Sequence, residues 1–379
     1  MDSLPPEILD HIISCLDDTD TATDKLYGEP ADLLDASLAT VDIKNASLVN
    51  STWRNACRRR LFQHIRWTIR PEEYEYQPAE GSYPPPLGHD LHRFLDSIAT
   101  TWPGGESVVA NVRSLRLVSG EAKGTFCMRR DATANLWPSI FSRINPRRVT
   151  AIGDPAALSI ILGLGYLEGS SAWMFDLPIQ LVQVTRRNAA STDPSTSYSC
   201  RGMPTLFSVR QWDSLLLNEG SFIPTYATYD YHHHVQPSLL HMLPASDGIA
   251  FDDFAYVSAF PTSPYFTVVF LLHMPTAKNI YIQIVPRELD FTRRLPPSTL
   301  GHLDIRDPWM ECISVWSSVG DIIFRGADLR PRWKHVDTFE MGATDHIENI
   351  WNDVEHRAVA QKPGELRWGI ARQGLLVRR

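Results

Sequence analysis

Two periodicities alternate along most of this chain, and they constrain its fold more than any single motif does. Apolar and polar residues alternate in short stretches such as 65–69 and 112–118, whereas 91–98 has its apolar residues at helical spacing. A period of two is typical of a strand, and a period of 3.6 is typical of a helix. Strand, helix and strand in succession predict a crossover unit with parallel pairing. The sequence therefore favours an α/β fold.

The same patterns recur towards the C-terminus. They predict short strands at 148–152, 179–184, 279–284, 303–305, 321–324 and 338–341, a helix over about 347–354, and a closing hairpin formed by 366–370 and 375–377. The strands are irregularly spaced, unlike the fixed period of about 20–29 residues in leucine-rich repeats. We therefore expect residues 63–379 to form one irregular α/β domain that resembles a degenerate leucine-rich repeat.

The first 62 residues predict helices instead. Prolines are tolerated in the first turn of a helix, and the apolar residues after them form one stripe: Ile8, Leu9, Ile12, Ile13 and Leu16. A second stripe follows the cap-like residues 50–52 and consists of Trp53, Ala56, Cys57 and Leu61. Residues from about 17 to 37 are rich in Asp, so we expect an acidic loop between the helices.

These residues resemble the F-box family. The resemblance is carried by Leu4-Pro5-Pro6-Glu7-Ile8-Leu9, by Ala46-Ser47-Leu48-Val49-Asn50-Ser51-Thr52-Trp53 and by Leu61-Phe62. The acidic insertion is longer than the connection that is usual in the family. The later chain resembles the large ascomycete group of F-box proteins, as in Trp137-Pro138-Ser139-Ile140 and in 215–223, which suggests a filamentous fungus as the source.

The resemblance implies the substrate-recognition subunit of an SCF-type E3 ubiquitin ligase, which is not itself an enzyme and needs no cofactor. Residues 1–62 would bind a Skp-type adaptor, and through it a cullin core, while residues 63–379 would bind an unknown target protein. The implied adaptor-binding residues are Leu4, Pro5, Ile8, Leu9, Ile12, Leu16, Leu48, Val49 and Trp53. An alternative is an adaptor-bound scaffold without a role in ubiquitylation.

A second alternative is a metal-dependent enzyme built around His232, His233 and His234. Imidazoles bind zinc, nickel and copper, but adjacent residues point in different directions on any regular backbone. A surface loop without metal is the better interpretation. No phosphate-binding loop, nucleophile elbow or H-E-x-x-H helix occurs in the sequence, so we find no catalytic constellation.

Charge and cysteine usage exclude other classes. The formal net charge of −8 argues against broad nucleic-acid binding, although a local basic patch remains compatible with it. The five cysteines form no C-x-x-C pair, and no apolar run reaches the roughly 20 residues that span a bilayer. We therefore expect no metal, no membrane association, and a location in the cytoplasm or nucleus.

Overall fold

The computed structural model describes residues 4–16, 24–34, 41–70, 87–101, 104–119, 135–164, 178–187, 204–227, 238–243, 250–287, 303–325, 331–361 and 368–379. The chain divides into two compact units. The first comprises Met1–Tyr166 and Gln183–Gln211, and the second comprises Leu167–Val182 and Trp212–Arg379.

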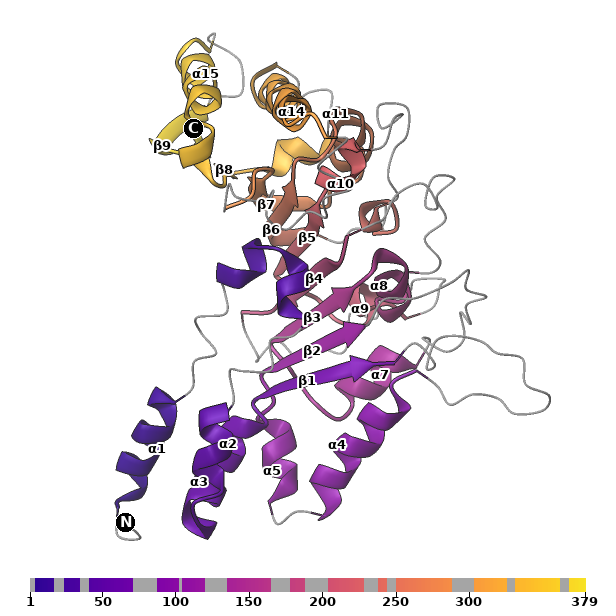
Figure 1. Ribbon diagram of the computed structural model, residues 1–379, viewed down its shortest axis with the longest axis vertical. Helices are drawn as coiled ribbons and strands as arrows, with labels where there is room; N and C mark the ends of the chain where they lie inside the picture. Colours follow the sequence, from indigo (N-terminus) through magenta and orange to yellow (C-terminus); the bar gives the residue numbers. More distant parts are fainter. Residues whose placement is uncertain are drawn as a thin grey trace, which may run out of the picture. The chain divides into compact units, whose positions relative to one another are not determined.

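The first unit begins with helices and continues as alternating strands and helices (Figure 1). Its elements are α1 (Pro6–Cys15), the 3-10 turns η2 (Asp24–Tyr27) and η3 (Pro30–Leu33), α2 (Val41–Ser47), α3 (Ser51–Leu61), β1 (His64–Ile69), α4 (His89–Thr101), α5 (Gly105–Ala110), β2 (Ser114–Ser119), α7 (Leu136–Phe141), β3 (Arg148–Gly153), α8 (Pro155–Ile161) and α9 (Leu206–Val209). Strand β4 (Gln180–Thr185) crosses the division between the units. Helix α3 ends at Leu61 and β1 begins at His64, so the helical start of the chain is followed directly by α/β structure within the same unit. The predicted boundary between two domains at residue 62 stays a prediction.

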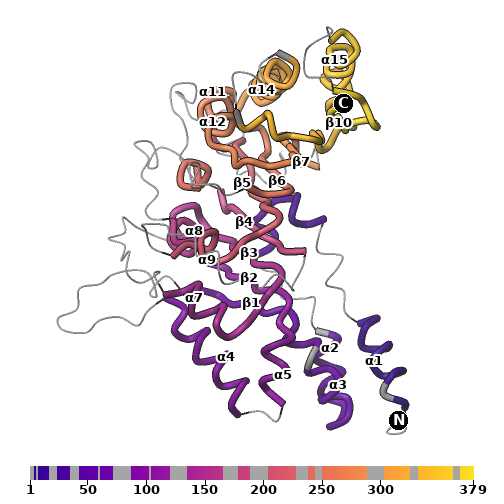
Figure 2. The backbone as a smooth tube through the Cα atoms, turned by 180° about the vertical axis from the view of Figure 1, so that it is seen from behind, coloured from indigo at the N-terminus to yellow at the C-terminus, as the bar shows by residue number. Residues whose placement is uncertain are grey.

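Strands β1, β2 and β3 pair in parallel, as the crossover pattern predicts. Their core-facing side chains are fully buried, including Leu115 and Leu117 of β2 and Val149 of β3. Helices α4 and α5 lie side by side in Figures 1 and 2. Their close approach requires a glycine, because a Cβ atom at Gly105 would overlap the carbonyl oxygen of Ile98.

The second unit contains the remaining strands. Its elements are β5 (Ser214–Ser221), α10 (Ile223–Tyr226), η7 (Leu239–His241), β6 (Ala250–Ala259), α11 (Ser263–Tyr265), the π turn η8 (Phe266–Phe270), α12 (Leu271–His273), β7 (Thr276–Gln283), α14 (Arg306–Arg325), η10 (Pro331–His335), β8 (Thr338–Met341), η11 (Thr344–His346), α15 (Glu348–Val359), β9 (Trp368–Arg372) and β10 (Leu375–Arg378). Strands β5 to β8 pair in parallel, whereas β10 is antiparallel to both β8 and β9 and forms the predicted hairpin.

The fold is thus mixed α/β, with a ten-stranded, mostly parallel sheet in the order β1-β2-β3-β4-β5-β6-β7-β8-β10-β9. The first eight strands follow one another in the sheet in the same order as in the chain. Whether residues 63–379 unfold as a single cooperative domain stays a prediction.

Two predicted strands are wrong. Residues 321–324 belong to helix α14, and 303–305 precede that helix without forming a strand. Buried side chains recur along α14 at helical spacing, at Cys312, Val315, Trp316, Val319 and Ile323. A window of four residues around Ile323 is too short to distinguish this period from that of a strand.

Strands β5 and β6 fall in the wide interval between the predicted strands 179–184 and 279–284, where no strand was expected. All six central residues of β5 are buried, so the strand shows no alternation of apolar and polar residues. Strands that are covered on both faces lose this signal. In the described part of the chain no helix is long and apolar enough to cross a membrane.

Candidate functional site

The start of α1 is set by its prolines. Pro5 has extended backbone angles (φ −53°, ψ 142°), and its carbonyl oxygen accepts hydrogen bonds from the amides of Ile8 at 3.0 Å and Leu9 at 3.1 Å. Since Pro6 occupies the first helical position, its missing N–H costs nothing there. Leu4 therefore lies just outside the helix.

Helices α1, α2 and α3 share a small core of their own. Its buried residues are Leu9 and Ile13 from α1, Ile43 and Ala46 from α2, and Cys57 from α3. Leu16, Trp53, Ala56 and Leu61 are partly buried against this cluster. Each fully buried aliphatic side chain contributes about 1.5–3 kcal/mol, so these few contacts hold three short helices together. Burial also raises the pKa of the Cys57 thiol, which keeps it protonated.

A side-chain cap determines where α3 begins. The Oδ1 atom of Asn50 accepts a hydrogen bond from the amide of Trp53 at 2.9 Å. Such a cap satisfies one of the unpaired amides in the first turn of a helix. Leu48 and Val49 lie in the short connection between α2 and α3, and both side chains are exposed.

The nine residues implied by the F-box resemblance separate into three groups by their exposure. Leu4, Ile8, Leu48 and Val49 are 39%, 49%, 72% and 59% exposed, and Pro5 is exposed as well. Ile12, Leu16 and Trp53 are half-buried. Leu9 is buried, only 4% exposed, because it packs in the shared core with Ile13. Its predicted role in adaptor binding stays a prediction. We call Leu4, Pro5, Ile8, Leu48 and Val49 the exposed apolar set.

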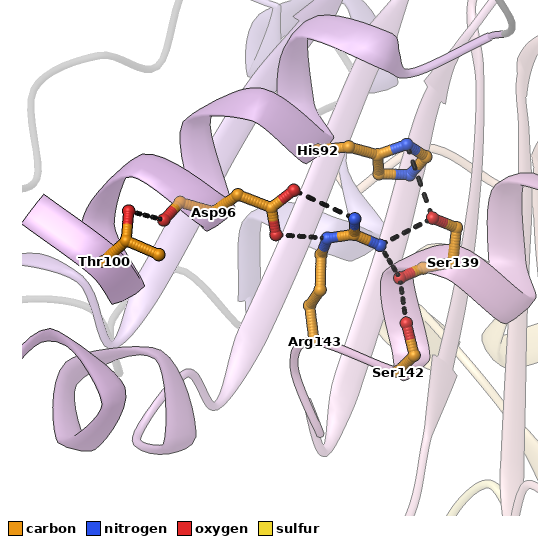
Figure 3. A network of polar contacts seen from close by, with 6 residues as sticks. All are labelled: His92, Asp96, Thr100, Ser139, Ser142 and Arg143. Carbon is orange, nitrogen blue, oxygen red and sulfur yellow. Dashed lines mark hydrogen bonds and ion pairs between the residues drawn. The ribbon is translucent and has the colours of Figure 1, made fainter.

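A polar network in the first unit has a serine, a histidine and an aspartate near one another (Figure 3). The Nδ1 atom of His92 lies 3.5 Å from the Oγ atom of Ser139. Asp96, however, accepts two hydrogen bonds from Arg143, at 2.7 and 2.9 Å, instead of orienting His92. Arg143 also donates to Ser139 Oγ at 2.7 Å. Burial and Arg143 lower the pKa of His92. The network therefore lacks the relay of a nucleophilic triad and instead links α4 to the end of α7.

Among the described residues of the second unit, Glu219 has a fully buried carboxyl group. Glu219 of β5 accepts hydrogen bonds from Ser238 at 2.5 Å, from Tyr256 at 2.7 Å, and from Tyr265. Burial raises the pKa of Glu219, while the three hydroxyl donors oppose that effect. These contacts join β5, β6, α11 and the segment before η7, so the group has a structural role in this unit.

The imidazoles of His241 and His273 lie close together, with ring centroids 4.6 Å apart. Burial lowers the pKa of both rings, and His273 lowers that of His241 further. Residues 232–234, the alternative metal site, lie outside the described residues. Among the residues that the structure describes, no three His, Cys, Asp or Glu side chains are grouped so as to hold a metal ion.

One surface was not singled out from the sequence. Arg66, Arg116 and Arg148 lie on one face of β1, β2 and β3, opposite the apolar face of these strands. The signal is present in the sequence, because each arginine alternates with apolar neighbours in its strand. We call these three side chains the arginine surface.

Comparison of the chain with protein-family models, with curated proteins and with solved structures finds no match.

Proposed function

We propose that this chain is the substrate-recognition subunit of an SCF-type ubiquitin ligase, with residues 1–62 as an F-box that binds a Skp-type adaptor. The observation that supports the proposal most is the exposed apolar set. Four of its members, Leu4, Ile8, Leu48 and Val49, are large apolar side chains that remain 39–72% exposed in or beside helices that have their own small core. Apolar side chains that a small module leaves in water are typical of a protein–protein interface.

The proposed recognition domain is an irregular, leucine-rich-repeat-like α/β domain over residues 63–379. The order of its strands supports this, since the first eight strands are neighbours in chain order, as in a repeat fold. Such a subunit makes and breaks no covalent bond. It holds a target close to the charged conjugating enzyme and so raises the effective concentration of the two reactants.

Co-expression with a fungal Skp-type adaptor tests the proposal. The wild-type chain should give a one-to-one complex on size exclusion, and Leu4→Ala with Ile8→Ala should weaken it by about ten- to a thousandfold, because truncation of an interface anchor costs about 1–4 kcal/mol. Val268→Ala with Leu272→Ala is the matched control, since these side chains are 48% and 45% exposed in the second unit. An empty pull-down from a soluble, monomeric chain would reject the F-box assignment.

Reconstituted ubiquitylation separates the ligase from an adaptor-bound scaffold. The complete ligase should transfer ubiquitin to a bound target only when this chain is present. Adaptor binding without any chain-dependent transfer would instead favour the scaffold. Metal analysis of tag-free protein addresses the enzyme alternative: one bound ion per chain, lost on changing His232, His233 and His234 to Ala, would favour it over the ligase.

A further inference from the structure

The arginine surface brings three guanidinium groups together on neighbouring strands. Arg66 and Arg116 are direct partners in the parallel pairing of β1 with β2. Arg148 is the partner of Ser114, which lies two residues before Arg116 and therefore on the same face. Strands lie about 4.8 Å apart and two residues span about 6.6 Å, so the Cα atom of Arg116 lies about 5 Å from that of Arg66 and about 8 Å from that of Arg148, and the outer two lie roughly 12 Å apart.

Like charges on directly opposed residues destabilise a sheet. Arg116 shows the cost: its pKa is lowered by burial and then by Arg66 and Arg148, with no carboxylate acting against them. Within the described residues, no ion pair joins any of the three arginines to an acidic side chain. Arg66 donates one hydrogen bond to the carbonyl oxygen of Leu34, which is neutral. The positive charge of this surface is therefore not neutralised by the described part of the chain.

The surroundings of the arginines are polar, and the arginines themselves are reachable from solvent. Arg66 is exposed, and Arg116 and Arg148 are half-buried. On the same face, His64 and Ser114 are hydrogen-bonded at 2.7 Å, and Thr150 donates to Gln183 at 2.9 Å. Thr150 and Gln183 are buried and paired with each other, so the half-buried His64–Ser114 pair is the polar group on this face that an anion beside the arginines can reach.

We propose that the arginine surface binds a carboxylate-rich peptide segment of a partner protein. Carboxylates on alternate residues of an extended peptide are about 6.6–7 Å apart, which lies between the roughly 5 Å and 8 Å Cα separations of neighbouring arginines, and each guanidinium can pair with one carboxylate through two hydrogen bonds. The inference rests on the proposed function only in making that peptide part of a ubiquitylation target. The binding itself does not depend on the ligase role.

An acidic peptide fits this surface better than a nucleic acid. The chain carries a net charge of −8, which repels a long phosphate backbone but matters less for a short peptide at a local cluster. Positions 64, 66 and 68 of β1, and 114, 116 and 118 of β2, include no Phe, Tyr or Trp on which bases would stack.

Fluorescence anisotropy with fluorescein-labelled hexaglutamate tests the inference on the full chain, with hexaglutamine as the uncharged peptide. Hexaglutamate should bind and hexaglutamine should not. Arg116→Gln with Arg148→Gln should weaken binding of hexaglutamate by about ten- to a hundredfold, because each charge-assisted contact contributes about a factor of ten. Lys278→Gln with Arg306→Gln removes the same charge from exposed positions of the second unit and should change the affinity less than about threefold.

Several results would overturn the inference: no binding of hexaglutamate, an equal loss in both double variants, or tighter competition by oligouridine than by unlabelled hexaglutamate. If the first double variant fails to fold, Arg66→Gln decides alone, since Arg66 is exposed, and an unchanged affinity would reject the surface. The adaptor pull-down is scored separately. If the chain binds the adaptor but not hexaglutamate, only this inference is rejected. If the chain binds hexaglutamate but not the adaptor, only the F-box assignment is rejected.

Discussion

Changing Glu219 to Gln isolates the energetics of the buried carboxyl group in the second unit. Because burial raises the pKa of Glu219, the folded protein retains a proton that the unfolded chain releases near pH 4.3. Stability from this group is therefore fully present below that pH and is lost as pH rises towards the folded-state pKa. The loss is about 1.4 kcal/mol for each pH unit within that window.

The hydrogen-bond geometry determines the cost of the substitution at acidic pH. The Oε2 atom of Glu219 accepts from Tyr256 and Tyr265, and a glutamine oxygen can replace it. The Oε1 atom faces Ser238, whose hydroxyl oxygen already accepts from the amide of Leu240 at 3.1 Å. An amide nitrogen at that place brings two hydrogens, and one of them stays buried without an acceptor. An orphaned buried donor costs about 1–3 kcal/mol, which is the expected destabilisation of the variant near pH 5.

Urea unfolding followed by circular dichroism, at several pH values between 5 and 8.5, measures the difference in free energy between the two proteins. The difference should shrink as pH rises, because only the wild type carries the titrating group. Tyr226→Phe is the control: it removes a neutral buried hydrogen bond to Phe260 in the same unit and should cost about 1 kcal/mol at every pH. A difference that grows with pH would mean that the three hydroxyl donors outweigh burial and that Glu219 is ionised, which would refute the reasoning.

Three further predictions concern the first unit, each measured as the change in free energy of unfolding in urea. Leu9→Ala should cost about 2–5 kcal/mol, because Leu9 belongs to the shared core of α1, α2 and α3. Leu48→Ala should change the stability by no more than about 0.5 kcal/mol, because Leu48 is exposed. Equal effects of the two substitutions would contradict the division between the shared core and the exposed apolar set. Asn50→Ala should cost about 1 kcal/mol through loss of the cap on α3, and Asn50→Asp should retain most of the stability. Arg116→Gln should leave stability unchanged or raise it by up to about 1 kcal/mol, since it relieves repulsion by Arg66 and Arg148; a clear loss would show that Arg116 has a structural role.

The parts of the fold that the sequence predicts well are those that bury one face. Strand β1 and the first half of β2 alternate because one face is packed and the other carries polar side chains, and α4 shows a helical stripe for the same reason. The prediction fails where that asymmetry disappears. Strand β5 is covered on both faces, and the C-terminal end of α14 offers too few residues to reveal the period of the whole helix.

The candidate surface was harder to predict than the fold. Ile8 and Leu9 are adjacent on α1, and both belong to one broad apolar stripe, yet one is 49% exposed and the other 4%. Hydrophobic periodicity gives the direction of the apolar stripe on a helix, but not its buried width, which is the part of the stripe that the core covers. That width depends on where α3 packs against α1, which is a tertiary contact and is not encoded in the period of either helix.

The apolar stripe of α1 is wider than the part of it that the core covers, and this difference is the physical link between the sequence pattern and the proposed adaptor binding. Consecutive residues of a helix are about 100° apart, so a single neighbour such as α3 covers Leu9 and leaves Ile8 in water. A lone exposed aliphatic residue needs no explanation, because much of any protein surface is apolar. Here, however, Leu4 just before α1 and Ile8 in its first turn are both exposed, and Leu48 and Val49 are adjacent, 72% and 59% exposed, in the connection before α3. Three short helices cannot enclose both sides of α1 and that connection at once. The sequence nevertheless keeps large apolar residues at these positions, where polar ones would improve solubility at no cost to the small core, and a protein partner that covers them accounts for that choice.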